Sequence, residues 1–401
     1  MIFKLRGKFQ HYVWGGMNFI PNFLKLTEAD DKPYAEYWLG AHPVAPSEIL
    51  FEQNWLPLDK VLETTPELLG EKIRSQFGDT LPYLLKILDI KQPLSIQVHP
   101  TKNEAEYGFE QENLRNIPLN APNRIYKDAN HKPEMMIALS DVWALHGFKP
   151  LLEIQASLQE HDSLKPIAQA LEEKGLPLVY ADIMQADKQQ LAQWILPVVE
   201  AKREEYQADK LKLDNPDYWV CYIVENMQSP LEEIDGGLIC FYFFNIVHMK
   251  KGEGLYQGAG LPHAYLRGQN IELMANSDNV IRGGLTPKYI DVPALLHSID
   301  YRAITPKIIP PYQENDGFIH LYPTPEAKDF ALQHMQFNAF DEENFTADCA
   351  SILLVMKGSI YIDLGEESIY LQQGESIFIA AQSQVEIIAE SDGYAVIATV
   401  P

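Results

Sequence analysis

The amino-acid sequence predicts a mainly β protein, of the sandwich or jelly-roll type, that carries a helical insert. Short apolar runs broken by Pro, Gly and Asn fill the chain up to about residue 150 and return from about residue 236. Between these parts lie two long stretches with helical spacing of apolar residues and almost no glycine. Many short strands with regular turn signals favour a sandwich or jelly roll over a parallel sheet.

The first 149 residues are predicted to form strands joined by turns, with one helix over residues 57–78. The runs "AEYWLGAHPVAP", "KQPLSIQVHP" and "HKPEMMIALS" have the length and the turn residues of strands. The helix, "PLDKVLETTPELLGEKIRSQFG", ends at a glycine. The apolar spacing of "PLLEIQASLQEHDSLKPIAQALEEKG" and "MQADKQQLAQWILPVVEAKREEYQ" then predicts a helical insert domain over residues 150–235.

An internal similarity indicates that two β units are related. "KKGEGLYQGAGLPHAYL" (250–266) aligns without gaps with "QQGESIFIAAQSQVEII" (372–388), so that His263 falls opposite Val385. In this alignment only the first unit keeps a ligand-type residue. We expect residues 1–149 and 236–320 to form the catalytic, metal-binding domain and residues 321–401 to form a C-terminal β domain without metal ligands.

The composition excludes several classes of partner. The 401-residue chain has 32 basic and 56 acidic residues, a net charge of −24, which argues against nucleic acid and anionic membranes. No apolar run has the length of a membrane span, and "MIFKLRGKFQ" lacks the apolar core of a signal peptide. Three scattered cysteines make no disulfide framework. We therefore expect a cytoplasmic protein. If its ligand is anionic, a few local Lys or Arg residues must counteract the negative electrostatic potential of the whole protein.

The stretch "PLSIQVHP" (93–100) places polar side chains on one face of a predicted strand. Alternation puts Ser95, Gln97 and His99 on the face opposite Ile96 and Val98. Burying such a polar group without a partner costs ~1–3 kcal/mol. A metal bound by the amide and the imidazole would provide that partner.

Two residues elsewhere in the chain complete a candidate metal set. His263 follows the glycine-rich turn "GAGLP", and Glu134 opens the apolar run "EMMIAL". With Gln97 and His99 they offer the nitrogen and oxygen ligands that suit zinc, with room for substrate oxygens. Simpler roles stay open at this point: an ion pair between Glu134 and Lys132, and a backbone hydrogen bond for Gln97.

Two cations stand in special positions. Arg282 precedes two glycines, and Lys288 lies in a Thr-Pro-Lys turn. Planar Arg suits oxyanion or phosphate recognition, whereas Lys acts as a point charge or, when desolvated, as a proton carrier. We expect most of the other histidines to have structural roles, and we expect His161 and His334 to lie on the solvated surface.

Taken together, these motifs resemble one family, the type I mannose-6-phosphate isomerases, which are zinc enzymes of the cupin class. The matching stretches are "YVWGG", "AEYWLGAHPVAPS", "LPYLLKILDIKQPLSIQVHP", "YKDANHKPEMMIAL" and "LPHAYLRGQNIELMANSDNVIRGGLTPKYIDV". They occur in family order and cover most of the chain outside the helical insert. The resemblance implies that both β units are double-stranded β-helices of the cupin type.

The resemblance also implies roles for individual residues. It implies that one zinc ion per chain is bound by Gln97, His99, Glu134 and His263, and that Arg282 is catalytic. It places Lys132 and Glu272 near the reacting carbons, and it links Lys86, His131 and Asp278 to proton transfer or ring opening. Ser95, Lys288 and Arg282 match phosphate contacts. The chain departs from the family pattern in "GAGLPH" and in His146, where the family often has Cys.

The reaction implied is the interconversion of mannose 6-phosphate and fructose 6-phosphate through an enediol, with the metal polarising O1 and O2 and with Arg282 stabilising the oxyanion. The proton-transfer base stays open among Lys132, Glu272, Lys86 and His99. A cupin iron oxygenase, a non-catalytic cupin that binds hexose phosphate, and a purely structural metal are the alternatives. We expect a small hexose phosphate as partner and a monomer, with an oligomer left open.

Overall fold

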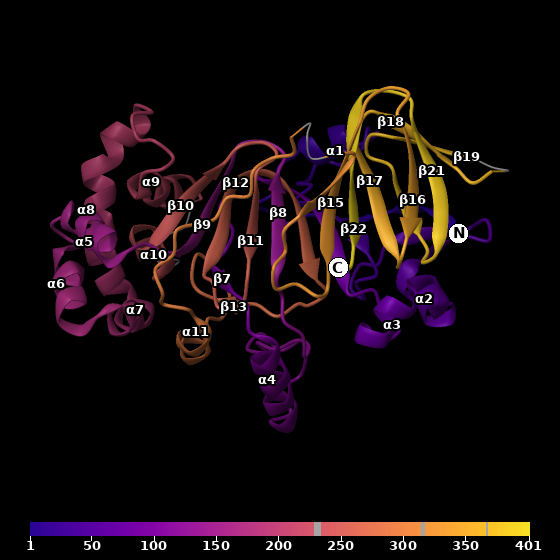
Figure 1. Ribbon diagram of the computed structural model, residues 1–401. Helices are drawn as coiled ribbons and strands as arrows, with labels where there is room; N and C mark the ends of the chain where they lie inside the picture. The colour runs from indigo at the N-terminus through magenta and orange to yellow at the C-terminus, as the bar shows by residue number, and fades with distance from the viewer. Residues whose placement is uncertain (228–233, 314–316, 366–367) are drawn as a thin grey trace.

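The computed structural model describes residues 1–227, 234–313, 317–365 and 368–401. The molecule is elongated, with a lobe of helices at one end, a large β-sheet in the middle and the C-terminal sheets at the other end (Figure 1). The prediction of a mainly β protein with a helical insert is confirmed.

The central sheet contains ten strands, six of them in the order β10-β9-β12-β6-β3-β2. The short strands β7 and β13 and the strands β8 and β11 join it through β12. The bounds are β2 (Lys8–Gln10), β3 (Glu36–Gly40), β6 (Tyr83–Ile90), β7 (Gln97–Val98), β8 (Glu134–Ala138), β9 (Val142–Phe148), β10 (Phe244–Met249), β11 (Gly254–Gln257), β12 (His263–Ala275) and β13 (Ile281–Arg282).

Strand β6 shows how the sequence builds two different faces on this sheet. All eight of its residues are buried. Leu85 and Ile87 join the large core that the central sheet shares with the C-terminal sheets, whereas Leu88 belongs to a separate cluster on the opposite face. Lys86 lies on this second face by alternation. The second face is therefore the one that carries the buried Lys86.

The C-terminal sheets include the start of the chain. The eight-stranded sheet has the order β14-β15-β22-β17-β20-β1-β4-β5, and Ile2 in β1 lies opposite Ile379 in β20. The four-stranded sheet has the order β16-β21-β18-β19. Their bounds are β1 (Ile2–Arg6), β4 (Glu48–Phe51), β5 (Asn54–Pro57), β14 (Ile319–Tyr322), β15 (Ala331–Phe337), β16 (Glu342–Ala347), β17 (Ser351–Lys357), β18 (Ser359–Asp363), β19 (Ser368–Gln372), β20 (Ser376–Ile379), β21 (Ser383–Ala389) and β22 (Gly393–Thr399).

The internal similarity has a structural counterpart. Strand β11 (Gly254–Gln257) and strand β20 (Ser376–Ile379) occupy identical positions in the alignment of residues 250–266 with residues 372–388. The strands that follow them, β12 and β21, begin within two positions of each other on the same scale. The domain boundaries at residues 149, 235 and 320 stay predictions.

The helical lobe has its own core. It contains α5 (Leu151–Gln159), α6 (Lys165–Lys174), α7 (Leu176–Gln185), α8 (Lys188–Gln207) and α9 (Pro216–Asn226). The side chains of Asp187 and Asn215 cap α8 and α9, which satisfies backbone N–H groups that a helix start leaves unpaired. Arg267 of β12 lies over the rings of Tyr218, Trp219 and Tyr222 of α9, at 5.6, 5.2 and 5.0 Å. These contacts join the lobe to the central sheet.

Several local predictions were wrong. Residues 57–78 form not one helix but α2 (Leu58–Thr64), a 3₁₀ turn (Pro66–Leu69) and α3 (Glu71–Phe77), because Pro66 and Gly70 interrupt the pattern. Residues 237–243, expected as β, form the buried helix α10 (Gly237–Phe243). The helices α1 (Phe19–Phe23), α4 (Lys102–Leu114) and α11 (Val292–Ser298) were not anticipated.

Two histidines expected at the surface are buried. His161 Nε2 donates to Asp217 Oδ1 at 2.9 Å, and the Tyr242 hydroxyl donates to the same oxygen at 2.8 Å. His334 stacks between the rings of Tyr312 and Tyr394. Tertiary contacts with distant residues, which the local sequence does not reveal, explain both burials.

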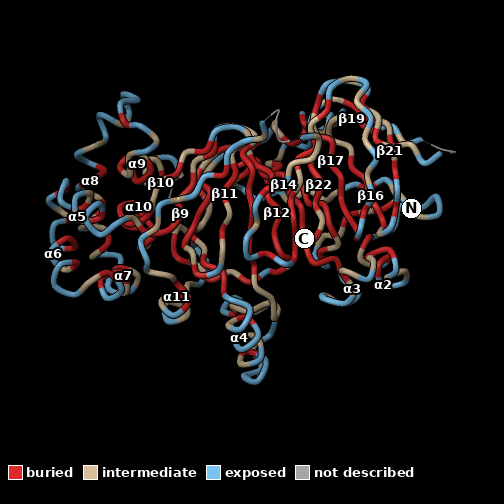
Figure 2. The backbone as a smooth tube through the Cα atoms, viewed as in Figure 1, coloured by how far each residue is buried: buried red, intermediate tan, exposed pale blue. Residues whose placement is uncertain are grey.

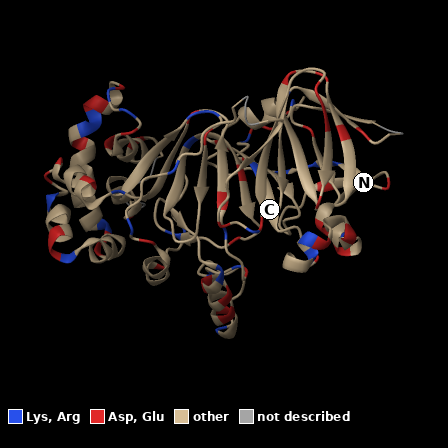
Figure 3. Cartoon of the chain, in the orientation of Figure 1, with Lys and Arg blue, Asp and Glu red and all other residues tan. Residues whose placement is uncertain are grey.

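Burial and charge follow this architecture. The strands of the sheets are mostly buried, whereas the helices of the lobe and α4 expose one side (Figure 2). Acidic residues are prominent on α4, and the helices of the lobe carry both acidic and basic residues (Figure 3). Among the helices of the described residues, none combines the length and the apolar character required to cross a membrane.

Candidate active site

Strand β12 supplies the site with residues from both of its halves. A β-bulge between Tyr265 and Arg267 changes its register against β9, and Gly268 next to it has a φ of +117° that favours glycine. A side chain at Gly268 would also press on the Asp141 carbonyl. Because a bulge shifts the alternation by one residue, Glu272 lies on the same side as Tyr265. The Tyr265 hydroxyl donates to Glu272 Oε1 at 2.9 Å.

Three of the four predicted metal ligands converge. The nearest ligand atoms of His99, Glu134 and His263 all lie within 4.8 Å of one another, and all three residues are buried. The His99 Nε2–Glu134 Oε1 distance is 3.2 Å, and the His263 Nε2–Glu134 Oε2 distance is 3.3 Å. Two ligands each about 2.1 Å from a tetrahedral zinc ion lie about 3.4 Å apart. The spacing therefore fits a shared ion.

Hydrogen bonds at Nδ1 fix the orientation of the His99 and His263 rings. His99 Nδ1 lies 2.9 Å from the Asn279 carbonyl and His263 Nδ1 lies 2.9 Å from the Leu261 carbonyl. A carbonyl only accepts, so each Nδ1 donates and each Nε2 is the ring atom turned toward Glu134. Burial lowers the pKa of His99 to about 4, which keeps this ring neutral at pH 7.

The unpaired nitrogen of His99 completes the test of fit. His99 Nε2 is buried and has no hydrogen-bond partner, although Glu134 Oε1 is close. A lone pair facing a carboxylate is unfavourable unless a cation lies between them. Burial alone raises the pKa of Glu134, but the neighbouring cation Lys132 holds it well below the usual range. The carboxylate is thus ionised, and the set is that of a divalent cation site.

Gln97, the fourth predicted ligand, lies beside the cluster in a row of directly opposed residues. His146 pairs with His263 across β9 and β12, His263 pairs with Gln97 across β12 and β7, and Gln97 pairs with Arg282 across β7 and β13. Directly opposed residues project to the same side of a sheet, with Cβ atoms about 5 Å apart. Gln97 is therefore between the metal cluster and Arg282.

A second charged group follows the metal cluster along the same face. Lys86 Nζ lies 3.0 Å from Glu272 Oε2 and 3.8 Å from Glu36 Oε2. Burial opposes the charge on Lys86, but Glu36 and Glu272 raise its pKa above the ordinary value. Burial raises the pKa of Glu272. Trp38 Nε1 donates to Glu36 and completes the group.

The remaining predicted residues lie around this face. Lys132 Nζ is 3.3 Å from Glu134 Oε1, so the ion pair considered for it is present. His131 Nε2 lies 2.6 Å from Asp329 Oδ2, and His42 Nε2 lies 3.2 Å from Asp278 Oδ1.

Two predicted phosphate contacts are less enclosed than the metal cluster. Lys288 is exposed, and Ser95 is half-buried. Ser95 precedes Ile96, whose backbone pairs with Gly283 and Gly284. The structure thus places Ser95 next to the loop that follows Arg282, and it records no side-chain contact between Lys288 and the other predicted residues.

The predicted strand around "PLSIQVHP" is shorter than expected. Only Gln97 and Val98 are in strand conformation, and His99 is as fully buried as Ile96 and Val98. The strand is therefore shorter than predicted, and the shared face of Ser95, Gln97 and His99 stays a prediction. The short pairing of β7 with β12 and β13, rather than a long strand, sets the position of Gln97.

A comparison with known proteins identifies the family. The model of the phosphomannose isomerase type I catalytic domain matches residues 2–151. Mannose-6-phosphate isomerase of Escherichia coli K12 is 34% identical over 387 residues, with 94% of each chain covered. The human mannose-6-phosphate isomerase is 31% identical over 425 residues, with 96% of this chain and 95% of the human protein covered. The chain belongs to the mannose-6-phosphate isomerase family.

Solved structures of mannose-6-phosphate isomerases share the whole fold. A Glu-to-Ala mutant of the Salmonella typhimurium phosphomannose isomerase superposes with a TM-score of 0.88, 31% identity and coverage of 100% of this chain and 99% of that chain. A zinc-bound mannose 6-phosphate isomerase gives a TM-score of 0.86 at 31% identity with the same coverage. The predicted type I family and the cupin fold class are confirmed.

Sequence reasoning missed several residues of this mannose-6-phosphate isomerase site. Glu36 and Trp38 lie within the quoted stretch "AEYWLGAHPVAPS" without an assigned role, and Tyr265 and Asn279 were not singled out. Alternation within "EYW" was the available signal for Glu36, because it places Glu36 and Trp38 on one face. No local signal pointed to Asp329, which reaches His131 from 198 positions away.

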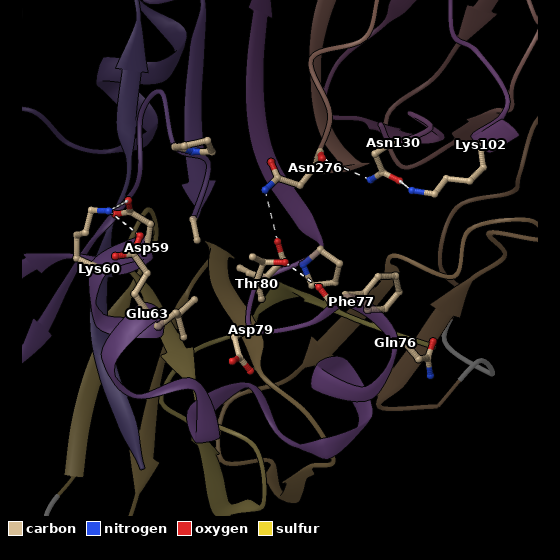
Figure 4. Close-up of a pocket in the computed structure, with 15 residues that line it drawn as sticks. Asp59, Lys60, Glu63, Gln76, Phe77, Asp79, Thr80, Lys102, Asn130 and Asn276 are labelled. Carbon is tan, nitrogen blue, oxygen red and sulfur yellow. Dashed lines mark hydrogen bonds and ion pairs between the residues drawn. The ribbon is translucent and has the colours of Figure 1, made fainter. Parts of the chain in front are cut away.

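Two other features of the molecule lie apart from this site. A hollow of about 570 Å³ lies between α2, α3 and the start of α4, and its labelled lining side chains include Asp59, Glu63 and Asp79 (Figure 4). None of the converging site residues lines it.

A second group of ligand-type side chains, Glu160, His161 and Asp217, lies in the helical lobe. There Lys202 approaches Asp217 within 3.9 Å, which disfavours a metal ion.

Proposed function

We propose that this protein is a zinc-dependent aldose–ketose isomerase that interconverts mannose 6-phosphate and fructose 6-phosphate. The observation that carries the proposal is the convergence of the Nε2 atoms of His99 and His263 on the buried Glu134 carboxylate. His99, Glu134 and His263, together with Gln97, would hold one zinc ion. A zinc ion there supplies a Lewis acid for the oxygens on C1 and C2 of the sugar.

The chain's own residues would carry the remaining steps. The isomerisation removes the proton from C2, passes through an enediol and adds a proton at C1, with no net oxidation. Arg282, half-buried and two strands from His263, would stabilise the negative charge that develops on oxygen. Burial lowers the pKa of Arg282, yet a guanidinium with such a high ordinary pKa remains charged.

Proton transfer would fall to Lys132 or Glu272. Lys132 Nζ touches Glu134, and Glu272 accepts from Tyr265 and from Lys86. His131 and Asp278 would assist ring opening, each held by a partner of opposite charge when the histidine is protonated, Asp329 for His131 and His42 for Asp278. Ser95, Lys288 and Arg282 would meet the phosphate, because they lie along or beside the loop after β13.

A coupled assay for fructose 6-phosphate formation, before and after chelation and return of zinc, tests the function. We expect activity to disappear with the metal and to return with zinc. His99→Ala should bind less than a tenth of the wild-type zinc, measured by elemental analysis. His161→Asn, in the separate cluster of the helical lobe, is the matched control and should retain it.

The alternatives predict different results. An iron oxygenase would consume oxygen with added ferrous iron and would form no fructose 6-phosphate. A non-catalytic cupin would bind mannose 6-phosphate without exchanging its C2 proton with solvent. Activity that survives complete chelation would contradict the role of the metal.

We also propose that the protein acts as a cytoplasmic monomer. All three cysteines are free and buried, which suits a reducing compartment. Light scattering of the eluting peak in gel filtration measures the mass directly. A mass near 45.7 kDa supports the monomer, and a multiple of it contradicts this assignment.

A further inference from the structure

A carboxylate lies behind the glycine loop that follows Arg282. Asp235 Oδ1 accepts hydrogen bonds from the backbone N–H of Leu285 at 2.9 Å and of Gly237 at 2.8 Å. Its second oxygen, Oδ2, accepts from the backbone N–H of Thr286 at 3.0 Å. One side chain at the junction of the helical insert with the central sheet therefore binds two consecutive amides of the loop.

The loop needs such a restraint because its backbone is unusual. Gly284 has a φ of +121° and Leu285, which is not glycine, has a φ of +55°. A side chain at Gly284 would lie 2.5 Å from the Gly237 Cα, so the loop is pressed against the start of α10. Left-handed backbone is unfavourable for leucine. The two hydrogen bonds to Asp235 flank this residue and offset the unfavourable conformation.

The opposite side of the same loop is bonded to the metal-binding strand segment. The N–H of Ile96 donates to the Gly284 carbonyl at 3.0 Å, and the N–H of Gly283 donates to the Ile96 carbonyl at 2.8 Å. Arg282 then pairs with Gln97. The loop is thus fixed at two places, by Asp235 behind Leu285 and by Ile96 next to Gln97, and Arg282 lies at its end.

The carboxylate also decides which groups of the loop can bind an anion. Glycine-rich loops often bind phosphate through backbone amides. Here the amides of Leu285 and Thr286 are already occupied by Asp235, and the N–H of Lys288 donates to Thr286 Oγ1. At these three positions a phosphate would depend on the side chains of Arg282 and Lys288 instead.

We propose that Asp235 is a positioning residue for substrate recognition, which acts through the loop 283–286 on the placement of Arg282 and Lys288. This inference rests on the proposed isomerase function and deepens it. It assigns the loop a side-chain rather than a backbone mode of phosphate recognition. It also makes the junction at the end of the helical insert part of the binding site's support.

Asp235→Asn is the decisive variant, because it keeps the shape and one acceptor oxygen but turns the other oxygen into a donor that faces an N–H. Asp291→Asn is the matched control. The Asp291 side chain also accepts from a backbone N–H, that of Ala294 in α11, nine positions beyond Arg282, but it does not touch the loop 283–286. Both variants should retain wild-type zinc content, because neither residue belongs to the metal set.

We expect Asp235→Asn to raise the KM for mannose 6-phosphate at least tenfold and to weaken competitive inhibition by inorganic phosphate by a similar factor. Asp291→Asn should change both values less than twofold, whatever its effect on the melting temperature. Equal KM and phosphate inhibition in the two variants would overturn the positioning role. If the wild-type protein with zinc forms no fructose 6-phosphate, the proposed function fails instead, so the two failures are distinguishable.

Discussion

Lys86 lies between two carboxylates, and this arrangement limits its chemistry. A lysine acts as a base only when it loses its proton, and both Glu36 and Glu272 favour the protonated form. Glu272 differs, since burial raises its pKa and therefore makes it a better proton acceptor than an ordinary carboxylate. We infer that Lys86 orients Glu272 and supplies positive charge.

Proton exchange at C2 with solvent deuterium separates these roles. Lys86→Met should retain measurable exchange, whereas either Glu272→Gln or Lys132→Met should reduce it by about 10²-fold or more, the usual contribution of a general base. Exchange is followed by NMR of mannose 6-phosphate in D₂O, with zinc content measured in each variant. If Lys86→Met lost exchange while Glu272→Gln and Lys132→Met kept it, this assignment would be contradicted.

Arg282 has a different expected signature. Arg282→Ala should keep its zinc, because it is not in the metal set, but should lose most of its turnover, by about 10²-fold or more if it stabilises the oxyanion. Arg282→Lys keeps the charge without the planar fork and should recover part of the activity. Near-normal turnover of the Ala variant, measured in the coupled assay, would remove Arg282 from the proposed mechanism.

At the scale of elements, α4 holds the segment that leads to His131 and Glu134. Thr101 and Glu104 form a reciprocal cap at its start. Further along, Glu112 accepts from the backbone N–H groups of Ile125 and Tyr126 and pairs with the buried guanidinium of Arg124 at 2.9 Å. This helix was absent from the sequence prediction, yet it fixes the approach to two site residues.

Glu112→Ala should destabilise the protein by roughly 3–5 kcal/mol, because it leaves a buried guanidinium without its carboxylate. It should also speed tryptic cleavage between residues 115 and 130. Glu110→Ala, on the exposed side of the same helix, is the control and should change stability by less than about 0.5 kcal/mol. Thermal unfolding and timed proteolysis measure both effects. Equal cleavage rates in the two variants would show that Glu112 does not restrain this segment.

The comparison of α10 with β6 shows how far the sequence predicts these elements. Both are short apolar runs that are entirely buried, and periodicity alone does not separate a buried helix from a buried strand. Strand β6 lies in the part of the chain that was predicted to form strands and turns, whereas α10 is fixed by its packing in the core of the lobe. The converging residues His99, Glu134 and His263 were predictable because they lie in short motifs. Asp235 and Asp329 were not, because their partners are remote in sequence.

At the scale of the whole molecule, buried histidines make stability depend on pH. Burial lowers the pKa of His146 from 6.5 to about 3. The unfolded chain then binds a proton below pH 6.5 that the folded protein excludes down to about pH 3. This contribution to stability is therefore complete above pH 6.5 and is lost as the pH falls, by up to ~1.4 kcal/mol per pH unit.

We expect the melting temperature to fall between pH 7.5 and pH 5, and the fall to be smaller in His146→Leu than in the wild type. His297→Gln is the control, because this side chain is 78% exposed. Calorimetry after chelation removes the contribution of bound metal. A fall of the same size in wild type and His146→Leu would contradict the role of His146.

The pairing of β1 with β20 has a consequence for the synthesis of the chain. The residues of β1 leave the ribosome before their partners in β20, which follow only after about 370 more residues have been added. At ~5–20 residues per second this interval is roughly 20–75 seconds. Throughout that time one edge of β1 is open to pairing with other chains. The nascent protein should accordingly depend on chaperone protection until β20 emerges.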